Sequence, residues 1–159
     1  MKISIFGLGY VGCVGAACLA KLGHQVIGVD VNENKVRLMN EGKPTIIEEG
    51  IAELCAEAHE KGLMRATTDV KDAVMNTDVS FIVVGTPSSK EGHLNLNYIY
   101  AVAKQIGDAL RDKVEIVKSE ELRVKSGLKH IVAIRSTVLP GTNEKVGKMI
   151  EEASGLVRG

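Results

Sequence analysis

Short apolar segments alternate with longer segments of helical periodicity along most of the chain. The apolar segments are rich in Ile and Val, as strands that are buried on both faces must be. They predict strands over residues 2–6, 25–30, 63–67, 79–84 and 130–135. This alternation is typical of repeated βαβ units, so we expect an α/β fold in which helices cover both faces of one parallel sheet.

Apolar residues at spacings of three and four predict the helices between these strands. Val11, Val14, Cys18 and Leu22 lie on one face of a first helix, which Gly23 can end. Asn32 can cap a second helix that runs to about residues 40–42. Further helices are expected over 48–61, from about residue 97, and after residue 141. We interpret 114–127 as a charged surface loop before the fifth strand, with no function that its residues indicate.

Charge and length restrict the kinds of partner and the number of domains. The 20 basic and 20 acidic residues give no net charge, so no excess field attracts nucleic acid or an anionic membrane. The 159 residues fit a single domain, 1–159. No apolar segment approaches the ~18 residues that a membrane span needs, and we expect no membrane partner.

Cys13, Cys18 and Cys55 form neither a CxxC pair nor a metal-binding spacing, which favours a reducing, cytoplasmic environment. Cys13 and Cys18 lie among small apolar residues, so we expect both to be buried hydrophobes and not catalytic thiols. The four histidines lie far apart and show neither a triad nor a metal pattern. We therefore predict no metal site, and we expect the histidines to be structural or to face solvent.

A glycine-rich turn follows the first strand. Gly7, Gly9 and Gly12 fit the pattern GxGxxG between a strand and a helix, as in the Rossmann-type doubly wound sheet of three αβα layers. Gly7 permits the tight turn, Gly9 lets the backbone approach a phosphate, and Gly12 lets the helix pack on the strand. The N–H groups at the start of the helix then attract a pyrophosphate, which indicates a dinucleotide-binding site.

Asp30 ends the second strand, close to the ~20-residue separation at which a carboxylate reaches the adenosine ribose in this fold. Its oxygens can accept hydrogen bonds from both ribose hydroxyls, whereas a 2′-phosphate would be repelled. Val31 and Asn32 follow, with no arginine to pair such a phosphate. The predicted cofactor is therefore NAD and not NADP.

Small and hydroxyl-bearing residues also follow the fourth and fifth strands. Gly85, Thr86 and Pro87 come after one, and Ser136 and Thr137 after the other. Such residues form turns as readily as they contact a ligand. Because ligands in open parallel sheets lie beyond the carboxyl ends of the strands, on the same edge as Gly9, we favour cofactor contact.

Four sequence blocks resemble the UDP-glucose/GDP-mannose dehydrogenase family and look like its NAD-binding domain. They are FGLGYVG at 6–12, GHQVIGVDVNENKV at 23–36, DVSFIVVGTPS at 78–88 and RSTVLPGT at 135–142. The last two blocks look closer to the GDP-mannose branch of the family than to its UDP-glucose branch, which stays as the alternative.

The resemblance implies NAD contacts from Tyr10 and Val11 at the turn, from Asp30 and Lys35 at the ribose, and from Thr86 and Thr137. Thr137 is also implied to position an active-site water. The implied reaction of the parent enzyme oxidises the sugar C6 alcohol to a carboxylate in two NAD-dependent steps, through a thiohemiacetal and a thioester.

The chain also departs from the family pattern. The family's catalytic cysteine motif, lysine, asparagine and sugar-nucleotide site belong to a second half that is not among these residues, and the usual Glu-Pro-Gly is Glu48-Glu49-Gly50 here. We therefore expect the isolated chain to bind NAD without catalysing, and to meet a nucleotide sugar only together with that second half. A non-enzymatic NAD-binding module, or a different NAD enzyme such as a 3-hydroxyacid dehydrogenase, remains an alternative.

Overall fold

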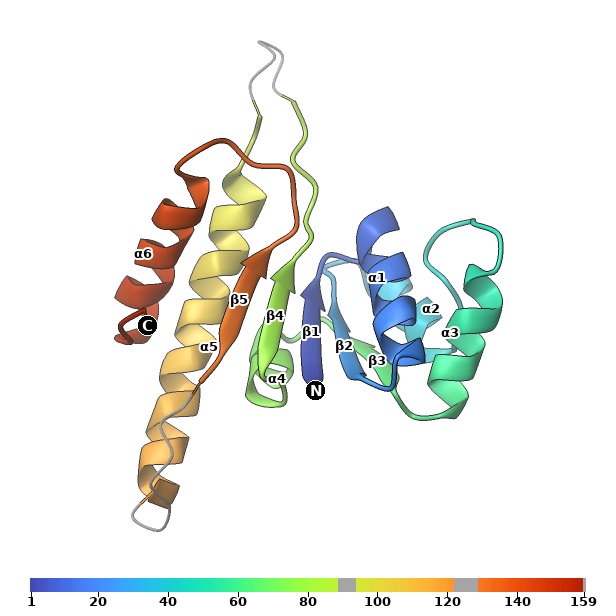
Figure 1. Ribbon diagram of the computed structural model, residues 1–159, viewed down its shortest axis with the longest axis horizontal. Coiled ribbons are helices and arrows are strands. Elements are labelled where there is room, and N and C mark those ends of the chain that lie inside the picture. Colours follow the sequence, from blue (N-terminus) through green and yellow to red (C-terminus); the bar gives the residue numbers. More distant parts are fainter. Residues whose placement is uncertain (89–93, 122–128, 159) are drawn as a thin grey trace.

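The computed structural model describes residues 1–88, 94–121 and 129–158. Within them, a five-stranded sheet forms the centre of the molecule (Figure 1). Its strands are β1 (Lys2–Phe6), β2 (Gln25–Val29), β3 (Met64–Thr67), β4 (Val79–Ile82) and β5 (Ile131–Ile134). They are arranged in the order β3-β2-β1-β4-β5, and all neighbouring pairs are parallel. The strand predictions are confirmed, with boundaries that differ by one or two residues.

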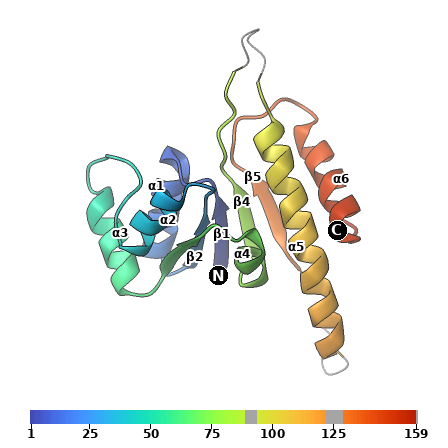
Figure 2. The same cartoon turned by 180° about the vertical axis from the view of Figure 1, so that it is seen from behind.

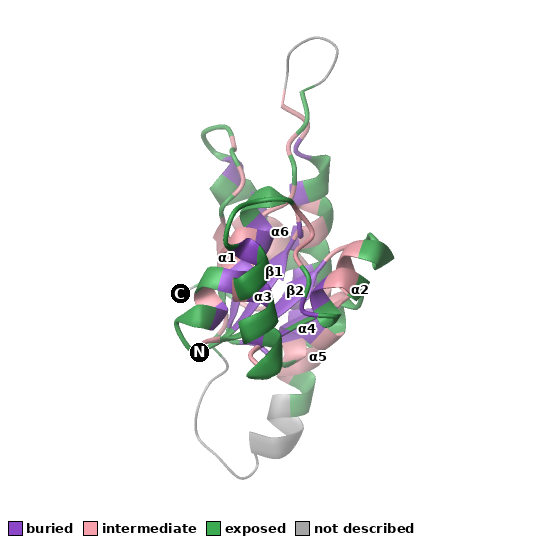
Figure 3. Ribbon diagram, turned by 90° about the vertical axis from the view of Figure 1, so that its right-hand side faces the viewer, coloured by how far each residue is buried: buried purple, intermediate pink, exposed green. Residues whose placement is uncertain are grey.

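Helices pack on both faces of this sheet and complete the three layers (Figures 1 and 2). On one face, Ile3, Ile5 and Val26 join a core with α1 (Tyr10–Lys21), α2 (Glu33–Asn40) and α3 (Ile51–Glu60). On the other, Phe6 and Ile82 join a core with α4 (Val70–Met75), α5 (Asn97–Glu121) and α6 (Thr142–Ser154). Seen from the side, the buried residues concentrate along the sheet between these layers (Figure 3). The predicted α/β fold with a doubly wound parallel sheet is confirmed.

The helix α4 is missing from the sequence-based expectation because its six residues are too few to show a helical period. A local signal was present, however. The side chain of Asp69 caps the helix by accepting hydrogen bonds from the backbone N–H groups of Lys71 and Asp72, at 2.8 and 3.2 Å. Asn32 caps α2 in the same way, as predicted.

The prediction of a charged loop over 114–127 is wrong for residues 114–121, which continue α5. Glycine and proline are absent from 108 to 126, and most residues there are good helix formers, so nothing in the sequence ends the helix. Residues 122–127 of the expected loop lie outside the described residues. No helix in the described part of the chain is long and apolar enough to span a membrane.

Buried polar groups connect β1 and β4 with His130, which precedes β5. The hydroxyl of Ser4 lies 2.7 Å from that of Ser80 and accepts a hydrogen bond from the hydroxyl of Thr77 at 3.1 Å. The Ser80 hydroxyl lies 2.8 Å from Nε2 of His130. Lys113 of α5 lies beside this group and donates from Nζ to the carbonyl oxygens of Val74 and Thr77, at 2.9 and 2.5 Å. These hydrogen bonds make polar groups compatible with a buried position.

Among the titratable side chains of this group, His130 has the pKa that its surroundings change most. Burial, together with the nearby charge of Lys113, lowers its pKa from 6.5 to about 4, against weaker opposing effects of the Thr77 backbone and Asp78. Between these two pH values the unfolded chain binds more protons at His130 than the folded chain does. The unfolded state therefore gains in stability as the pH falls through this window.

We expect His130→Gln to reduce the acid sensitivity of the fold, because glutamine has no proton to take up. Between pH 6.5 and 4, the free energy of unfolding of the unaltered chain should fall by about 3 kcal/mol more than that of the variant. Urea unfolding at a series of pH values measures this difference. Parallel pH profiles for the two proteins would contradict it.

Candidate functional site

The predicted site residues follow strands whose carboxyl ends meet at one edge of the sheet, the end to which the arrows point in Figure 1. The strand order reverses direction between β1 and β4, which are neighbours. The glycine turn follows β1, Asp30 follows β2, and the Gly85 and Ser136 segments follow β4 and β5. In open α/β sheets a crevice at such a reversal is where ligands bind.

The glycines of the turn have three different surroundings. Gly7 has a φ of +105°, and a Cβ there would lie 2.7 Å from the carbonyl oxygen of Val83. A Cβ at Gly12 would lie 1.8 Å from the carbonyl oxygen of Gly7, far inside the van der Waals contact distance. A Cβ at Gly9 would meet no atom within 4 Å. Gly7 and Gly12 are therefore required by the fold, whereas Gly9 faces open space of the kind that a ligand needs.

The start of α1 provides unused hydrogen-bond donors. Gly9 is its N-cap and has no side chain to cap it, and the first backbone bond of the helix runs from the N–H of Cys13 to the carbonyl of Gly9, at 2.9 Å. In the described part of the chain, the N–H groups of Gly9, Tyr10, Val11 and Gly12 donate to no protein group. Donors at a helix N-terminus, together with the helix dipole, favour an anion.

Asp30 contacts the glycine turn directly, which the sequence reasoning missed. Its Oδ2 accepts a hydrogen bond from the backbone N–H of Leu8 at 2.7 Å, and its Oδ1 accepts one from the N–H of Asn32 at 2.9 Å. Nζ of Lys35 lies 3.4 Å from Oδ2, so the structure brings the two predicted ribose contacts together. The side chain of Asp30 is only 10% exposed, and these three donors leave acceptor capacity on Oδ1.

The residues after β4 and β5 divide into two kinds. The hydroxyl of Ser136 donates to the carbonyl oxygen of Val84 at 2.7 Å, so it ties the end of β5 to the end of β4. The hydroxyls of Thr86 and Thr137, in contrast, make no hydrogen bond to any described residue. Thr137 and Pro87 are exposed, and Gly85 borders open space. Thr86 and Thr137 thus have hydroxyls available at the same edge as the glycine turn.

Of the two cysteines that the sequence predicts to be buried, Cys13 is buried and Cys18 is not. Cys13 of α1 and Cys55 of α3 are fully buried. The interaction between the two thiols lowers the pKa of Cys13 and raises that of Cys55, which its burial raises further. The expectation of a buried Cys18 is wrong: Cys18 is exposed, because five positions along a helix separate it from the buried side on which Cys13 lies.

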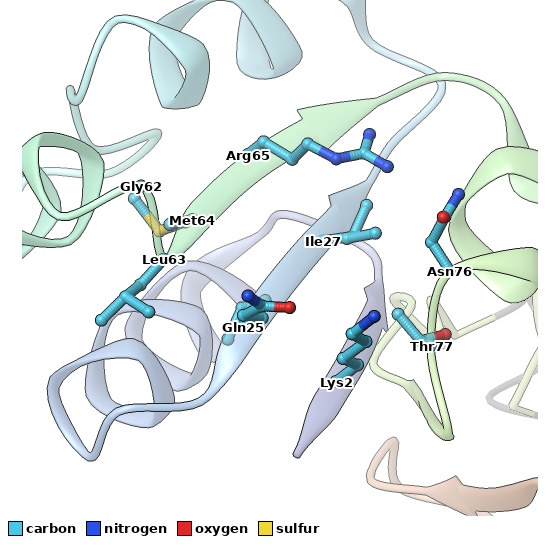
Figure 4. A pocket seen from close by; sticks show the side chains of 10 residues that line it. Lys2, Gln25, Ile27, Gly62, Leu63, Met64, Arg65, Asn76 and Thr77 are labelled. Atoms are coloured by element: carbon cyan, nitrogen blue, oxygen red, sulfur yellow. The ribbon is translucent and has the colours of Figure 1, made fainter.

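A cavity of about 250 Å³ lies at the opposite edge of the sheet (Figure 4). Lys2 and Gln25, which begin β1 and β2, line it together with Arg65, Asn76 and Thr77. No predicted site residue lines this cavity, so it is separate from the ligand edge. In the described residues, no cluster of histidine, cysteine, aspartate or glutamate is suited to a metal ion.

Comparison with known proteins agrees with this geometry. The sequence profile of the UDP-glucose/GDP-mannose dehydrogenase family, NAD binding domain, matches residues 1–157. GDP-mannose 6-dehydrogenase of Pseudomonas aeruginosa is 50% identical over 98% of this chain, and UDP-glucose 6-dehydrogenase AglM of Haloferax volcanii is 39% identical over 98%. The crystal structure of a ternary complex of GDP-mannose dehydrogenase from Pseudomonas aeruginosa matches with a TM-score of 0.87 at 50% identity, over 98% of this chain and 33% of that chain. The chain spans 33% of the length of each of the two curated relatives.

Alanine substitutions should separate the glycine that the fold requires from the glycine that faces open space. Gly12→Ala should lower the free energy of unfolding by about 3 kcal/mol, because the new methyl collides with the Gly7 carbonyl. Gly9→Ala should change it by less than about 0.5 kcal/mol, since its φ of −77° suits alanine and the methyl meets no atom. Urea unfolding of the two variants measures both effects. Equal destabilisation by the two substitutions would contradict the assignment.

Proposed function

The chain belongs to the UDP-glucose/GDP-mannose dehydrogenase family and forms its NAD-binding domain, and from this premise we propose which residues hold the cofactor. The N–H groups of Gly9, Tyr10 and Val11 bind the pyrophosphate. This is supported by the open space at Gly9 and by the absence of an acceptor for these groups among residues 1–88, 94–121 and 129–158. Gly7 and Gly12 shape the turn without contacting the ligand through side chains.

Asp30 and Lys35 hold the adenosine ribose in this proposal. The remaining acceptor capacity of Oδ1 on Asp30 can take a ribose hydroxyl, and Lys35 has further N–H donors beyond the one that faces Asp30. A 2′-phosphate would place a second negative group beside a carboxylate that is 10% exposed. Lys35 offsets part of this repulsion, and the chain offers no adjacent arginine. The site therefore prefers NAD to NADP.

The nicotinamide half of the cofactor lies, in this proposal, towards β4 and β5. Gly85 leaves space there, Pro87 stiffens the segment, and Thr86 and Thr137 offer hydroxyls. Ser136 contributes by holding the end of β5 against β4, since its hydroxyl already donates to Val84. Bound NAD supplies a hydride acceptor. Thr137 would orient a water beside the reacting carbon, since its hydroxyl makes no hydrogen bond to any described residue.

For the longer enzyme we propose NAD-dependent 6-dehydrogenation of a nucleotide sugar, GDP-mannose to GDP-mannuronate with two NAD reduced. The support is the 50% identity to a GDP-mannose 6-dehydrogenase, against 39% for a UDP-glucose 6-dehydrogenase, which is the alternative substrate class. The family match argues against the 3-hydroxyacid dehydrogenase alternative. We also propose a cytoplasmic location with neither nucleic acid nor membrane as partner, in keeping with the zero net charge and the cysteine pattern.

Calorimetric titration tests the cofactor assignment. The unaltered chain should bind NAD on the order of 100-fold more tightly than NADP, because of the charge at Asp30. Asp30→Asn should bring the two affinities closer together by removing that charge while keeping an oxygen acceptor. Asp30→Ala should lose NAD affinity altogether, and Gly9→Ala should lose it without loss of stability. Equal affinity of the unaltered chain for the two cofactors would overturn the role of Asp30.

The 159 residues on their own should produce no NADH from NAD and GDP-mannose, because we expect the sugar-nucleotide site and the nucleophile in the second half of the longer enzyme. NAD bound without that site has no positioned alcohol from which to accept a hydride. Absorbance at the NADH band over an extended incubation measures this, with NAD binding confirmed on the same sample. NADH formation that depends on GDP-mannose would refute the proposal that this chain binds NAD but needs the second half of the enzyme for catalysis.

A further inference from the structure

Thr45 makes a contact with the glycine turn that no sequence motif predicts. It belongs to the connection between α2 and α3, which forms a loop beside the upper end of α1 in Figure 1. Its hydroxyl donates to the carbonyl oxygen of Leu8 at 2.8 Å, and its backbone N–H lies 3.4 Å from Sγ of Cys13. A residue 37 positions away in sequence therefore holds both the turn and the first turn of α1.

Leu8 is thereby held at both of its backbone polar groups. Its N–H donates to Asp30 and its carbonyl oxygen accepts from Thr45, while its side chain is fully buried. In a planar trans peptide the C=O and the following N–H point in opposite directions. Each hydrogen bond at Leu8 therefore sets the direction of a neighbouring group that it does not touch.

The Gly7–Leu8 peptide, whose N–H donates to Asp30, shows this geometry directly. Because the Leu8 N–H points to Asp30, the Gly7 carbonyl must point the other way, and its oxygen does occupy the space of a Cβ at Gly12. By the same geometry, the Leu8 carbonyl points to Thr45 and the Gly9 N–H must point away from it. That N–H donates to no described group.

We propose that Thr45 is a positioning residue for the cofactor: by holding the Leu8 carbonyl, it directs the Gly9 N–H towards the pyrophosphate. This inference rests on the proposed function, in which that N–H binds a phosphate oxygen. Without the hydroxyl, the Leu8 carbonyl has no hydrogen-bond donor among the described residues, and the Leu8–Gly9 peptide is free to rotate. Binding then has to reorder the peptide, which lowers affinity.

The test compares Thr45→Val, which removes the hydroxyl at nearly constant shape, with Thr45→Ser, which keeps it. NAD affinity by calorimetry should fall about fivefold to tenfold in Thr45→Val and stay within about twofold of the unaltered chain in Thr45→Ser. Without NAD, the Gly9 amide signal should be sharp in the unaltered chain and in Thr45→Ser and broadened by exchange in Thr45→Val, whereas at saturating NAD it should move downfield in all three. A general loss of packing would not be rescued by serine and would not single out Gly9.

Thermal unfolding of each variant monitors the fold. If Thr45→Val does not fold, Thr45→Ala replaces it, because it removes the hydroxyl without placing a methyl group against the Leu8 carbonyl. The same broadening of the Gly9 amide signal in the absence of NAD is required of it. Unchanged NAD affinity in the hydroxyl-free variant, or an equal loss in Thr45→Ser, overturns the role of Thr45 alone. Failure of the unaltered chain to bind NAD overturns the proposed function and this inference together.

Discussion

The orientation of the two peptide groups beside Leu8 determines the shape of the glycine turn at the ligand edge. Asp30 holds the Leu8 N–H, so the Gly7 carbonyl turns towards α1, and Gly12 must lack a side chain to make room for it. Thr45 holds the Leu8 carbonyl. The glycine pattern and the aspartate, which sequence reasoning treats as separate contacts with one ligand, are thus physically linked within the protein itself.

The two ends of the sheet show how the same kinds of polar group serve opposite purposes. In the buried cluster, Ser4, Ser80 and Thr77 satisfy one another, with Lys113 closing the group, and this connects the strands. At the ligand edge, the N–H groups that begin α1 find no acceptor within the described residues. Satisfied polar groups stabilise the fold, whereas donors left without partners are prepared for a ligand.

Much of this could be predicted from the sequence because it depends on local periodicity and backbone sterics. The strands, most helices, the Asn32 cap and the glycine turn are of this kind. Features that are short or that depend on long-range contacts could not be predicted from the sequence. The helix α4 is too short to show a helical period, and Thr45 contacts Leu8 only because of the tertiary fold. The charge of residues 114–121 does not distinguish a loop from the end of α5, because charged residues such as Lys and Glu also form helices well. The exposure of Cys18 depends on its position around the helix and not on the composition of the segment.

The link between Asp30 and the turn also bears on specificity. A flexible surface carboxylate could swing away from a 2′-phosphate and admit it at little cost. Asp30 is held by two backbone N–H groups, of Leu8 and Asn32, and moving it would leave the buried Leu8 N–H without a partner. In the proposed site, the charge is therefore fixed where an NADP phosphate would lie, and displacing it would disturb the pyrophosphate turn as well. Discrimination between the two cofactors then depends on the rigidity of Asp30 as much as on its charge.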